Sequence, residues 1–283
     1  MTTAMKAPLE FPARETPDFS EGEVYFIGNA TTVIRYGGFT ILTDPAFMHR
    51  GGYADLGHGI YTRREVDPAC DLTDLPWLDI VVLSHFHGDH FDEVSLRELN
   101  PQLPIISTFH AIGELRAHGF ERGHALDTWE SIPAVKGEAQ LRITAMPGKH
   151  APDPLAAMFP PVMGTMFDFS RGRERLFRLY ITGDTLLHDR LHDIAIRYPG
   201  IDLALVHIGG AMLLSTMVSM TGVQGVRAVE IVRPHVATPI HYNDFSVFAS
   251  GLDDFKKAAE ASTPATEFHY LMHGDTYRFR RNA

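Results

Sequence analysis

Short apolar runs alternate with stretches of helical periodicity along the chain, which predicts an α/β protein. Runs rich in β-branched and aromatic residues predict strands, and Gly37-Gly38 predicts a tight hairpin between two of them. Strands are expected at residues 24–27, 32–36, 40–43, 78–84, 104–108, 140–145, 176–182, 203–207 and 237–241. Helices are expected at residues 92–99, 110–118, 222–232 and 252–261. Because strands alternate with helices twice over, the pattern predicts a four-layer αββα sandwich of two similar halves.

The N-terminus and the longest loops differ in composition from the rest. Residues 1–22 contain prolines without hydrophobic periodicity and are expected to form a flexible N-terminal arm. Residues 23–283 show no linker or short repeat, so a single domain is expected, ending in a hairpin over residues 268–279. The glycine-rich residues 45–59 and the proline-rich residues 152–164 are expected to be loops.

Composition and charge exclude several classes of protein. With 45% hydrophobic and 21% charged residues, the chain is typical of globular domains. It carries 25 Lys and Arg against 35 Asp and Glu, a formal net charge of −10, so nucleic-acid binding is not expected. Cys70 is the single cysteine, which points to a reducing compartment. Neither a transmembrane run nor a secretory signal is visible, so we expect a soluble, cytoplasmic protein.

The sequence SHFHGDH, directly after the apolar run LDIVVL, concentrates side chains of metal-ligand type. In extended backbone, residues two apart point to the same side, so His85 and His87 are expected to reach one ion. Gly88 permits a sharp turn that redirects Asp89 and His90 toward a second ion. A solvated histidine-rich turn is the alternative, but so many ligand types in so few residues favour a metal site.

Two ions need more ligands than this cluster supplies, and three later strand ends offer them. His150 ends the segment ITAMPGKH, Asp184 lies in ITGDT, and His241 ends the strand of TPIHY. Taken alone, each is more often a capping or core residue. Together with the first cluster they favour a binuclear site.

On these residues the chain resembles the metallo-β-lactamase superfamily of binuclear metal hydrolases. Its branch is similar to the ascorbate-6-phosphate lactonase-like and N-acyl-phosphatidylethanolamine phospholipase D-like proteins. The resemblance runs from about residue 23 to 280 and also rests on GNAT, LTDP, PPVMG, GDT, IGG and PIHY. It implies the αββα fold and a ligand set: His85, His87 and His150 for metal one, Asp89, His90 and His241 for metal two, and Asp184 as the bridge. It also implies that Asp44 of LTDP orients a ligand histidine.

Two positions depart from the family pattern. Asn29 stands where many members have histidine in GHAT, and His207 stands where related chains often carry proline before IGG. Both are expected near the mouth of the pocket. The two departures therefore make the substrate harder to infer from the family, but they do not affect the expected metal ligands.

The expected ligand chemistry indicates a metal and a reaction type. Nitrogen and oxygen ligands without a thiolate favour Zn, with Mn or Fe as alternatives. Two divalent ions, two carboxylates and a hydroxide leave about +1 in the cavity, which favours an anionic small molecule or lipid as substrate. We expect a metal-bridging hydroxide to attack an ester, lactone or phosphodiester, with Asp89 and Asp184 in the catalytic centre.

Other residues are weaker candidates. His207 and His188 follow strand ends near the expected ligands and are candidate general acids or substrate contacts, with a hydrogen-bonded structural role as the alternative. Substrate contacts are also expected from residues in or near the pocket loops, with surface or core-packing roles as the alternative. These candidates are Asn29, His49, Tyr53 and Met163.

Two other functional classes stay open at this stage. The first is an iron-dependent oxidoreductase on the same fold. Its flavin-dependent members use a glutamate at the position of His87 and carry a further domain, for which too few residues follow His241. The second is a non-catalytic metal-binding relative, which we would expect to have lost ligands. A homo-oligomer is the general default for soluble proteins that associate.

Overall fold

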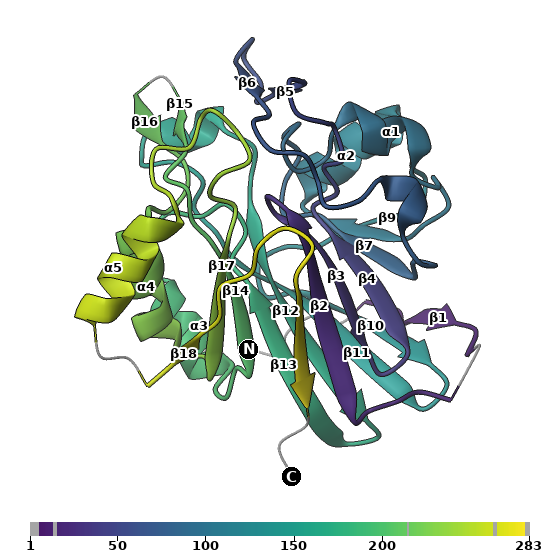
Figure 1. The fold of residues 1–283 in the computed structure, drawn as a ribbon. Helices are drawn as coiled ribbons and strands as arrows, with labels where there is room; N and C mark the ends of the chain where they lie inside the picture. The colour runs from purple at the N-terminus through teal and green to yellow at the C-terminus, as the bar shows by residue number, and fades with distance from the viewer. Residues whose placement is uncertain (1–5, 14–15, 214, 263–264, 281–283) are drawn as a thin grey trace.

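Two mixed β-sheets lie face to face at the centre of the molecule, and helices lie outside them on both sides (Figure 1). The computed structural model describes residues 6–13, 16–213, 215–262 and 265–280. Within these residues the αββα architecture predicted from the sequence is confirmed.

The first sheet has seven strands, and an antiparallel part continues into a parallel part. Its order is β19 (Thr276–Arg280), β2 (Glu21–Gly28), β3 (Thr31–Tyr36), β4 (Phe39–Thr43), β7 (Ile80–Val82), β8 (Ile105–Ser107) and β9 (Gly123–Ala125). Strands β19 to β4 are antiparallel neighbours, and β4, β7, β8 and β9 are parallel. The predicted hairpin at Gly37-Gly38 joins β3 to β4, with positive φ of 57° and 79° that glycine adopts without strain.

The second sheet has eight strands and repeats the same arrangement. Its order is β1 (Leu9–Phe11), β10 (Ser131–Lys136), β11 (Ala139–Pro147), β12 (Met163–Arg171), β13 (Glu174–Ile181), β14 (Leu203–His207), β17 (Val236–Ile240) and β18 (Glu267–Phe268). Strands β10 to β13 are antiparallel neighbours, and β13, β14, β17 and β18 are parallel. The two similar halves expected from the sequence therefore correspond to two sheets with the same order of antiparallel and parallel strands.

Helices pack on both outer faces because one side of each is apolar. Helices α1 (Glu93–Glu98) and α2 (Phe109–Ala117) lie on the side of the first sheet, where Ile112 and Leu115 pack with Val81 and Ile105. Helices α3 (Leu191–Arg197), α4 (Gly222–Val232) and α5 (Leu252–Ala261) lie on the side of the second sheet. Helix α4 starts where the sequence predicts, because Thr221 and Gln224 form a capping box there.

Side chains from the facing surfaces of the two sheets form the largest core cluster. Phe26 and Ile34 of the first sheet and Phe167 and Leu179 of the second are fully buried in it. Among the described residues, no helix is both long and apolar enough to cross a membrane.

Several short elements lie outside the two large sheets. Two small hairpins are formed by β5 (Tyr53–Asp55) with β6 (Tyr61–Arg63) and by β15 (Met212–Leu213) with β16 (Thr216–Met217). Two 3₁₀ turns, η1 (Leu72–Asp74) and η2 (Leu155–Met158), lie in the loops. The predicted loop over residues 45–59 therefore contains β5, because a three-residue strand gives too short a pattern to detect.

Several predicted elements need correction. The hairpin expected over residues 268–279 is wrong, because β18 pairs with β17 in one sheet and β19 pairs with β2 in the other. The expected flexible arm is wrong for residues 9–11, which form β1 and pair in parallel with β10. Residues 1–5 and 14–15 of that arm lie outside the described residues. Strands β10 and β12 and helix α3 were not predicted.

Candidate metal centre

The carboxyl ends of six strands meet at one edge of the sandwich, and four of them lead to the candidate ligands. Strand β7 leads into the segment with His85 and His87, and β11 leads to His150. Strands β13 and β17 lead to Asp184 and His241. Strands β2 and β4 end in the same way, at residues 29 and 44. The fold thus brings together candidate ligands that are up to 156 positions apart in the sequence numbering, from residue 85 to residue 241.

The first ligand group consists of His85, His87 and His150, all buried. The Nε2 of His85 lies 3.0 Å from the Nδ1 of His87, and the Nε2 of His150 lies 3.3 Å from the same atom. The outer nitrogens are held from behind: His150 Nδ1 donates to the Val218 carbonyl at 2.9 Å, and His85 Nδ1 hydrogen-bonds with Ser84 Oγ at 3.0 Å. Such bonds fix the ring orientation and turn the remaining nitrogens toward one point.

The second group consists of Asp89, His90 and His241, also buried. The Nε2 atoms of the two histidines are 3.2 Å apart, and Asp89 Oδ2 lies 3.7 Å and 3.5 Å from them. The Nδ1 of His241 donates to the Ile208 carbonyl at 3.1 Å, which again turns the free nitrogen inward.

Asp184 connects the two groups. Its Oδ2 lies 3.6 Å from His90 Nε2, and it forms a third cluster of potential ligands with His85 and His90. Because His85 belongs to the first group and His90 to the second, this carboxylate is placed where a bridging ligand would lie.

Asp44, at the end of β4, supports the second group from behind. Its Oδ1 accepts the Ser84 N–H at 2.7 Å and lies 3.5 Å from His90 Nδ1. Burial raises the pKa of Asp44, but the neighbouring imidazoles of His207 and His90 outweigh burial and bring it to about 2. An ionised Asp44 therefore faces His90, as expected for a residue that orients this ring.

Electrostatics separates the two groups. Burial, reinforced by His150, lowers the pKa of His87 to about 3, and burial beside other histidines holds that of His85 well below its usual range. Burial also lowers the pKa of His90, but Asp89 and Asp184 outweigh it and raise this pKa well above the usual range. His85 and His87 are thus neutral and have lone pairs free to bind a metal. In the second group, a protonated His90 is paired with Asp89 and Asp184, and a metal cation would take the place of that proton.

The donor set fits divalent metal ions. Buried imidazole nitrogens lie within 4.8 Å of one another in the first group, and two imidazole nitrogens and a carboxylate oxygen do so in the second. In the described residues, Asp89 Oδ1 is buried without a hydrogen-bond partner, an expensive state that a cation or an ordered water would relieve. Nitrogen and oxygen donors of this kind suit Zn, Mn and Fe.

Comparison with known proteins gives the family. Residues 40–242 match a family described as the Beta-lactamase superfamily domain. The chain belongs to this family.

Relatives of this beta-lactamase superfamily protein cover nearly the whole chain. A protein of Aeropyrum pernix named a metal-dependent hydrolase is 24% identical over 266 residues, 90% of this chain and 96% of its own. An isothiocyanate hydrolase from Delia radicum gut bacteria has a similar structure, with a TM-score of 0.75, 19% identity and coverage of 92% and 99%. A diiron beta-hydroxylase from Streptomyces venezuelae gives a TM-score of 0.62 at 15% identity, covering 94% of this chain and 55% of its own. At such identities the structural likenesses show the fold alone.

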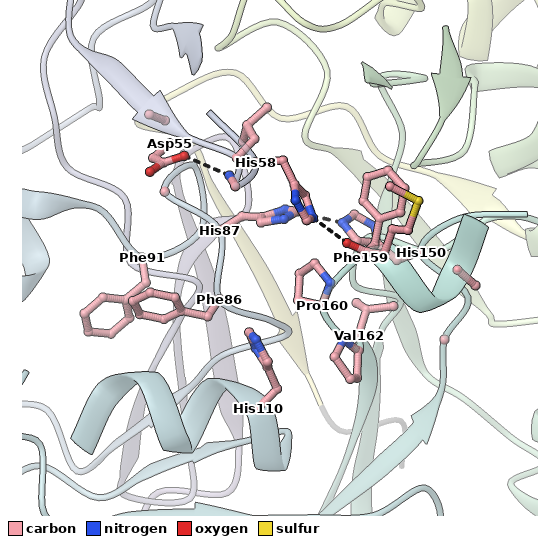
Figure 2. A pocket seen from close by; sticks show the side chains of 18 of the residues that line it. Asp55, His58, Phe86, His87, Phe91, His110, His150, Phe159, Pro160 and Val162 are labelled. Carbon is pink, nitrogen blue, oxygen red and sulfur yellow. Dashed lines mark hydrogen bonds between the residues drawn. The ribbon is translucent and has the colours of Figure 1, made fainter. Parts of the chain in front are cut away.

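A cavity of about 1350 Å³ opens beside the first ligand group of this superfamily member. His87 and His150 line it, and their rings lie next to each other (Figure 2). Tyr53 and His188, predicted from the sequence as site residues, line it. Burial, together with Arg190 and Lys149, lowers the pKa of His188 to about 4, so its ring is neutral at pH 7. A neutral imidazole is a better proton acceptor than donor at that pH.

Four other sequence-predicted residues lie away from the cavity. His49 is exposed and bonds with Asp71 at 2.8 Å, and Met163 is buried in the core between the sheets. His207 is fully buried, with its Nε2 3.8 Å from Asp44 Oδ2. Asn29 is fully buried as well. The structure therefore does not place these four side chains in contact with a substrate in this cavity, because strand packing and surface pairing hold them elsewhere.

Asn29 instead ties both segments of the second ligand group together. Its Nδ2 donates to the Asp89 carbonyl at 2.6 Å, and its own carbonyl accepts the His241 N–H at 2.8 Å. Its N–H donates to Asp244 Oδ2 at 2.8 Å, and Asp244 Oδ1 pairs with the fully buried Arg64 at 3.2 Å. We name Asn29, Arg64 and Asp244 the clamp.

Sequence reasoning missed Arg64 and Asp244. The two are 180 positions apart, so no local pattern shows that they pair. The available signal was the position of Asp244, three residues after the candidate ligand His241.

Gly88 lies in the turn predicted at this point, which the N–H groups of His90 and Phe91 close by donating to the His87 carbonyl at 3.0 and 2.8 Å. Its φ is not among the positive ones, so a left-handed turn is not what requires glycine. Instead, a Cβ atom at this position would lie 2.7 Å from the Asp55 nitrogen of β5. Glycine is required because the ligand segment packs against this strand, to which Gly88 also donates its N–H at 2.8 Å.

Proposed function

We propose that the protein is a binuclear metal-dependent hydrolase. The observation that carries this proposal is the pair of buried ligand groups with Asp184 adjacent to both. Membership of the beta-lactamase superfamily and the naming of full-length relatives as metal-dependent hydrolases support it.

The proposed ligands follow the grouping of the side chains. One ion would be held by the first group and one by the second, with Asp184 between them. Zn is the favoured metal, with Mn or Fe as alternatives, because the donors are imidazole and carboxylate. When bound, two such ions supply Lewis-acid polarisation of the scissile group and lower the pKa of a water molecule toward neutrality.

The protein's own residues would orient the reactants. Asp89 Oδ1, which is free of hydrogen bonds within the described structure, would accept a proton or hydrogen bond from the attacking water. Asp184 would hold the two sites at a fixed separation. His188, neutral and on the cavity wall, would contact the substrate or accept a proton.

The bond type is proposed as an ester, lactone or phosphodiester. All three place a polarisable oxygen at the metals and develop negative charge there in the transition state, which a cationic centre stabilises. The anionic substrate expected from the sequence rests on this charge at the centre. The mainly acidic cavity wall restricts the expected negative charge of the substrate to its reacting group.

The experiment is hydrolysis of aryl ester, lactone and aryl phosphodiester substrates by the zinc-loaded protein. We expect turnover that a chelator removes and that Asp184→Asn and His87→Ala abolish while circular dichroism shows an intact fold. His235→Ala is the matched control, because His235 is exposed at the opposite end of β17 and should retain activity. Turnover that survives Asp184→Asn would overturn the proposal.

Iron-dependent oxidation is the second candidate, and the likeness to a diiron beta-hydroxylase shows that this fold accommodates it. Its signature would be oxygen consumption by the iron-loaded protein in the presence of an oxidisable substrate. A non-catalytic role would instead show full metal loading without turnover on any of the substrates.

A further inference from the structure

The cavity beside the ligand groups has apolar walls on two sides. Phe86 and Phe91 lie on one side and Pro160 and Val162 on the other (Figure 2). Leu96 of α1 continues the first wall. Next to the ligands, the ring of Phe159 packs edge-on against His150 with centroids 5.7 Å apart. Apolar surface therefore begins at the metal site itself and extends outward.

Charged groups on the cavity wall are mainly acidic. The wall carries five carboxylates and two cationic side chains: Asp55, Asp92, Glu93, Asp153, Asp189, Lys149 and Arg190. Lys149 and Asp153 neutralise each other, since Lys149 Nζ lies 2.7 Å from Asp153 Oδ2, and the buried Asp92 caps α1. Three carboxylates therefore remain on the wall against one cation: Asp55, Glu93, Asp189 and Arg190. A substrate with a negative charge away from its reacting group would meet repulsion here, because like charges disfavour one another.

Two loops that line the cavity are joined by a hydrogen bond. His58, beside β5, donates from Nε2 to the Met158 carbonyl of η2 at 2.7 Å. Both residues line the cavity, and they belong to segments 100 positions apart. This bond links the two loops, which both contribute to the cavity wall.

We infer that the substrate is a carboxylic ester or lactone with an uncharged, apolar acyl or aryl tail. The tail lies between Phe86 and Leu96 on one side and Pro160 and Val162 on the other. The inference rests on the proposed function and narrows it. Water adds to the carbonyl carbon, the bond from that carbon to the ester oxygen breaks, and the leaving alcohol takes one proton. Negative charge is then confined to the reacting group at the centre.

The cavity volume agrees with such a tail. At about 1350 Å³ it exceeds the 300–1,000 Å³ or so typical of sites for small molecules. Each buried methylene should strengthen binding by roughly threefold to fourfold, the equivalent of about 0.8 kcal/mol.

The test uses zinc-loaded protein and a series of straight-chain alkyl hydroxamates, from acetohydroxamate to octanohydroxamate, measured by calorimetry. Hydroxamates bind zinc through the head group, which is the same in the whole series, so differences in Kd measure the contribution of the alkyl tail. We expect the Kd to fall by roughly threefold per methylene over the first several carbons. A hydroxamate of equal length that ends in a carboxylate should lose most of this gain.

Two pairs of variants locate the tail. Leu96→Glu adds a charge to the wall, and Ile196→Glu adds it to an exposed position of α3 that does not line the cavity. Ala157→Glu and Leu155→Glu form the second pair within η2, where both side chains are exposed and Ala157 alone of the two lines the cavity. In Leu96→Glu and Ala157→Glu the hydroxamate Kd should depend less on chain length than in the wild type. In the two control variants the dependence should be unchanged.

The outcomes separate the inference from the proposed function. Zinc uptake with hydroxamate affinity independent of chain length, or a length dependence unchanged in both wall variants, would overturn the apolar tail and leave the metal centre standing. Failure to bind zinc at all would overturn the proposed function itself, and the inference with it.

Discussion

Histidines of this protein differ in charge according to the side chains that surround them. His85 and His87 lie among other histidines and are neutral, whereas His90 and His241 lie beside Asp89 and Asp184, which raise the pKa of both rings against the effect of burial. A metal binds neutral imidazole, so uptake by the second group must displace protons. The histidines of the two groups thus differ in charge before a metal binds.

His188 leads to a prediction of pH-dependent stability. Its pKa is about 4 when folded, against an ordinary value of 6.5, so below pH 6.5 the unfolded chain binds a proton that the folded protein does not. The stability contributed by neutral His188 is therefore present above pH 6.5 and is lost progressively as the pH falls toward 4. His188→Gln removes this contribution.

The measurement is chemical denaturation of metal-free protein between pH 7.5 and 4. The slope of unfolding free energy against pH should be shallower in His188→Gln by up to about 1.4 kcal/mol per pH unit. His235→Ala, at an exposed position, serves as the control. Identical slopes in wild type and His188→Gln would show that the ring is not held neutral.

Individual contacts explain which site residues the sequence could predict. The segment SHFHGDH places its ligand types within six residues, so spacing alone indicates a site. Asn29 was expected at the pocket mouth, yet it is buried beneath the site and bonded to Asp89 and His241. A motif shows which residue differs from the family pattern but not which way its side chain points.

At the scale of elements, the clamp joins the ends of β2 and β17 to the segment that follows β7. Asn29 contacts the backbone of both Asp89 and His241, and it has a positive φ of 51°. Asparagine tolerates this left-handed conformation better than most residues. The clamp therefore positions two ligands of one group without touching the other group.

Asn29→Ala should weaken the second ligand group selectively. Loss of a residue that orients ligands lowers metal affinity by roughly 10-fold to 100-fold. Calorimetric titration with zinc should show one class of sites unchanged and the other weakened by this factor. Asn100→Ala, at an exposed asparagine, is the matched control. Equal weakening of both classes would indicate general destabilisation instead.

The buried pair of Arg64 and Asp244 should dominate the stability of this region. Both side chains are fully buried, and Arg64 also donates to the Ala46 and Val66 carbonyls at 2.8 Å each. Arg64→Leu leaves Asp244 buried without its cation, which lowers the free energy of unfolding by about 3–5 kcal/mol.

Urea denaturation of metal-free protein checks this prediction. Arg227→Leu removes an exposed pair with Glu230 on α4 and should change stability by less than about 1 kcal/mol. A similar small change for Arg64→Leu would mean that the buried pair is replaceable by apolar packing.

At the scale of the whole molecule, the sequence predicted the layers better than their connections. Strands such as β3 and β4 are joined by a two-residue turn, so their pairing follows from local pattern. Strand β19 crosses to the opposite sheet to pair with β2, more than 250 positions earlier in the sequence numbering. Pairing over such separations depends on the assembled core rather than on neighbouring residues.

The residues that line the cavity also depend on the assembled fold, so the sequence predicted only some of them. Met163 was a candidate substrate contact in the sequence, but β12 places it in the core between the sheets. Tyr53 and His188 were predicted as site residues and do line the cavity. Apolar composition alone does not distinguish a residue that faces a ligand from one that faces another sheet.

We propose that the chain holds two metal ions in adjacent sites. The most direct measurement is metal content per chain by mass spectrometry after loading with zinc and removal of free metal. We expect two zinc ions in the wild type and one in His241→Ala, with the fold retained in both. A single ion in the wild type, or no loss in His241→Ala, would contradict a binuclear centre.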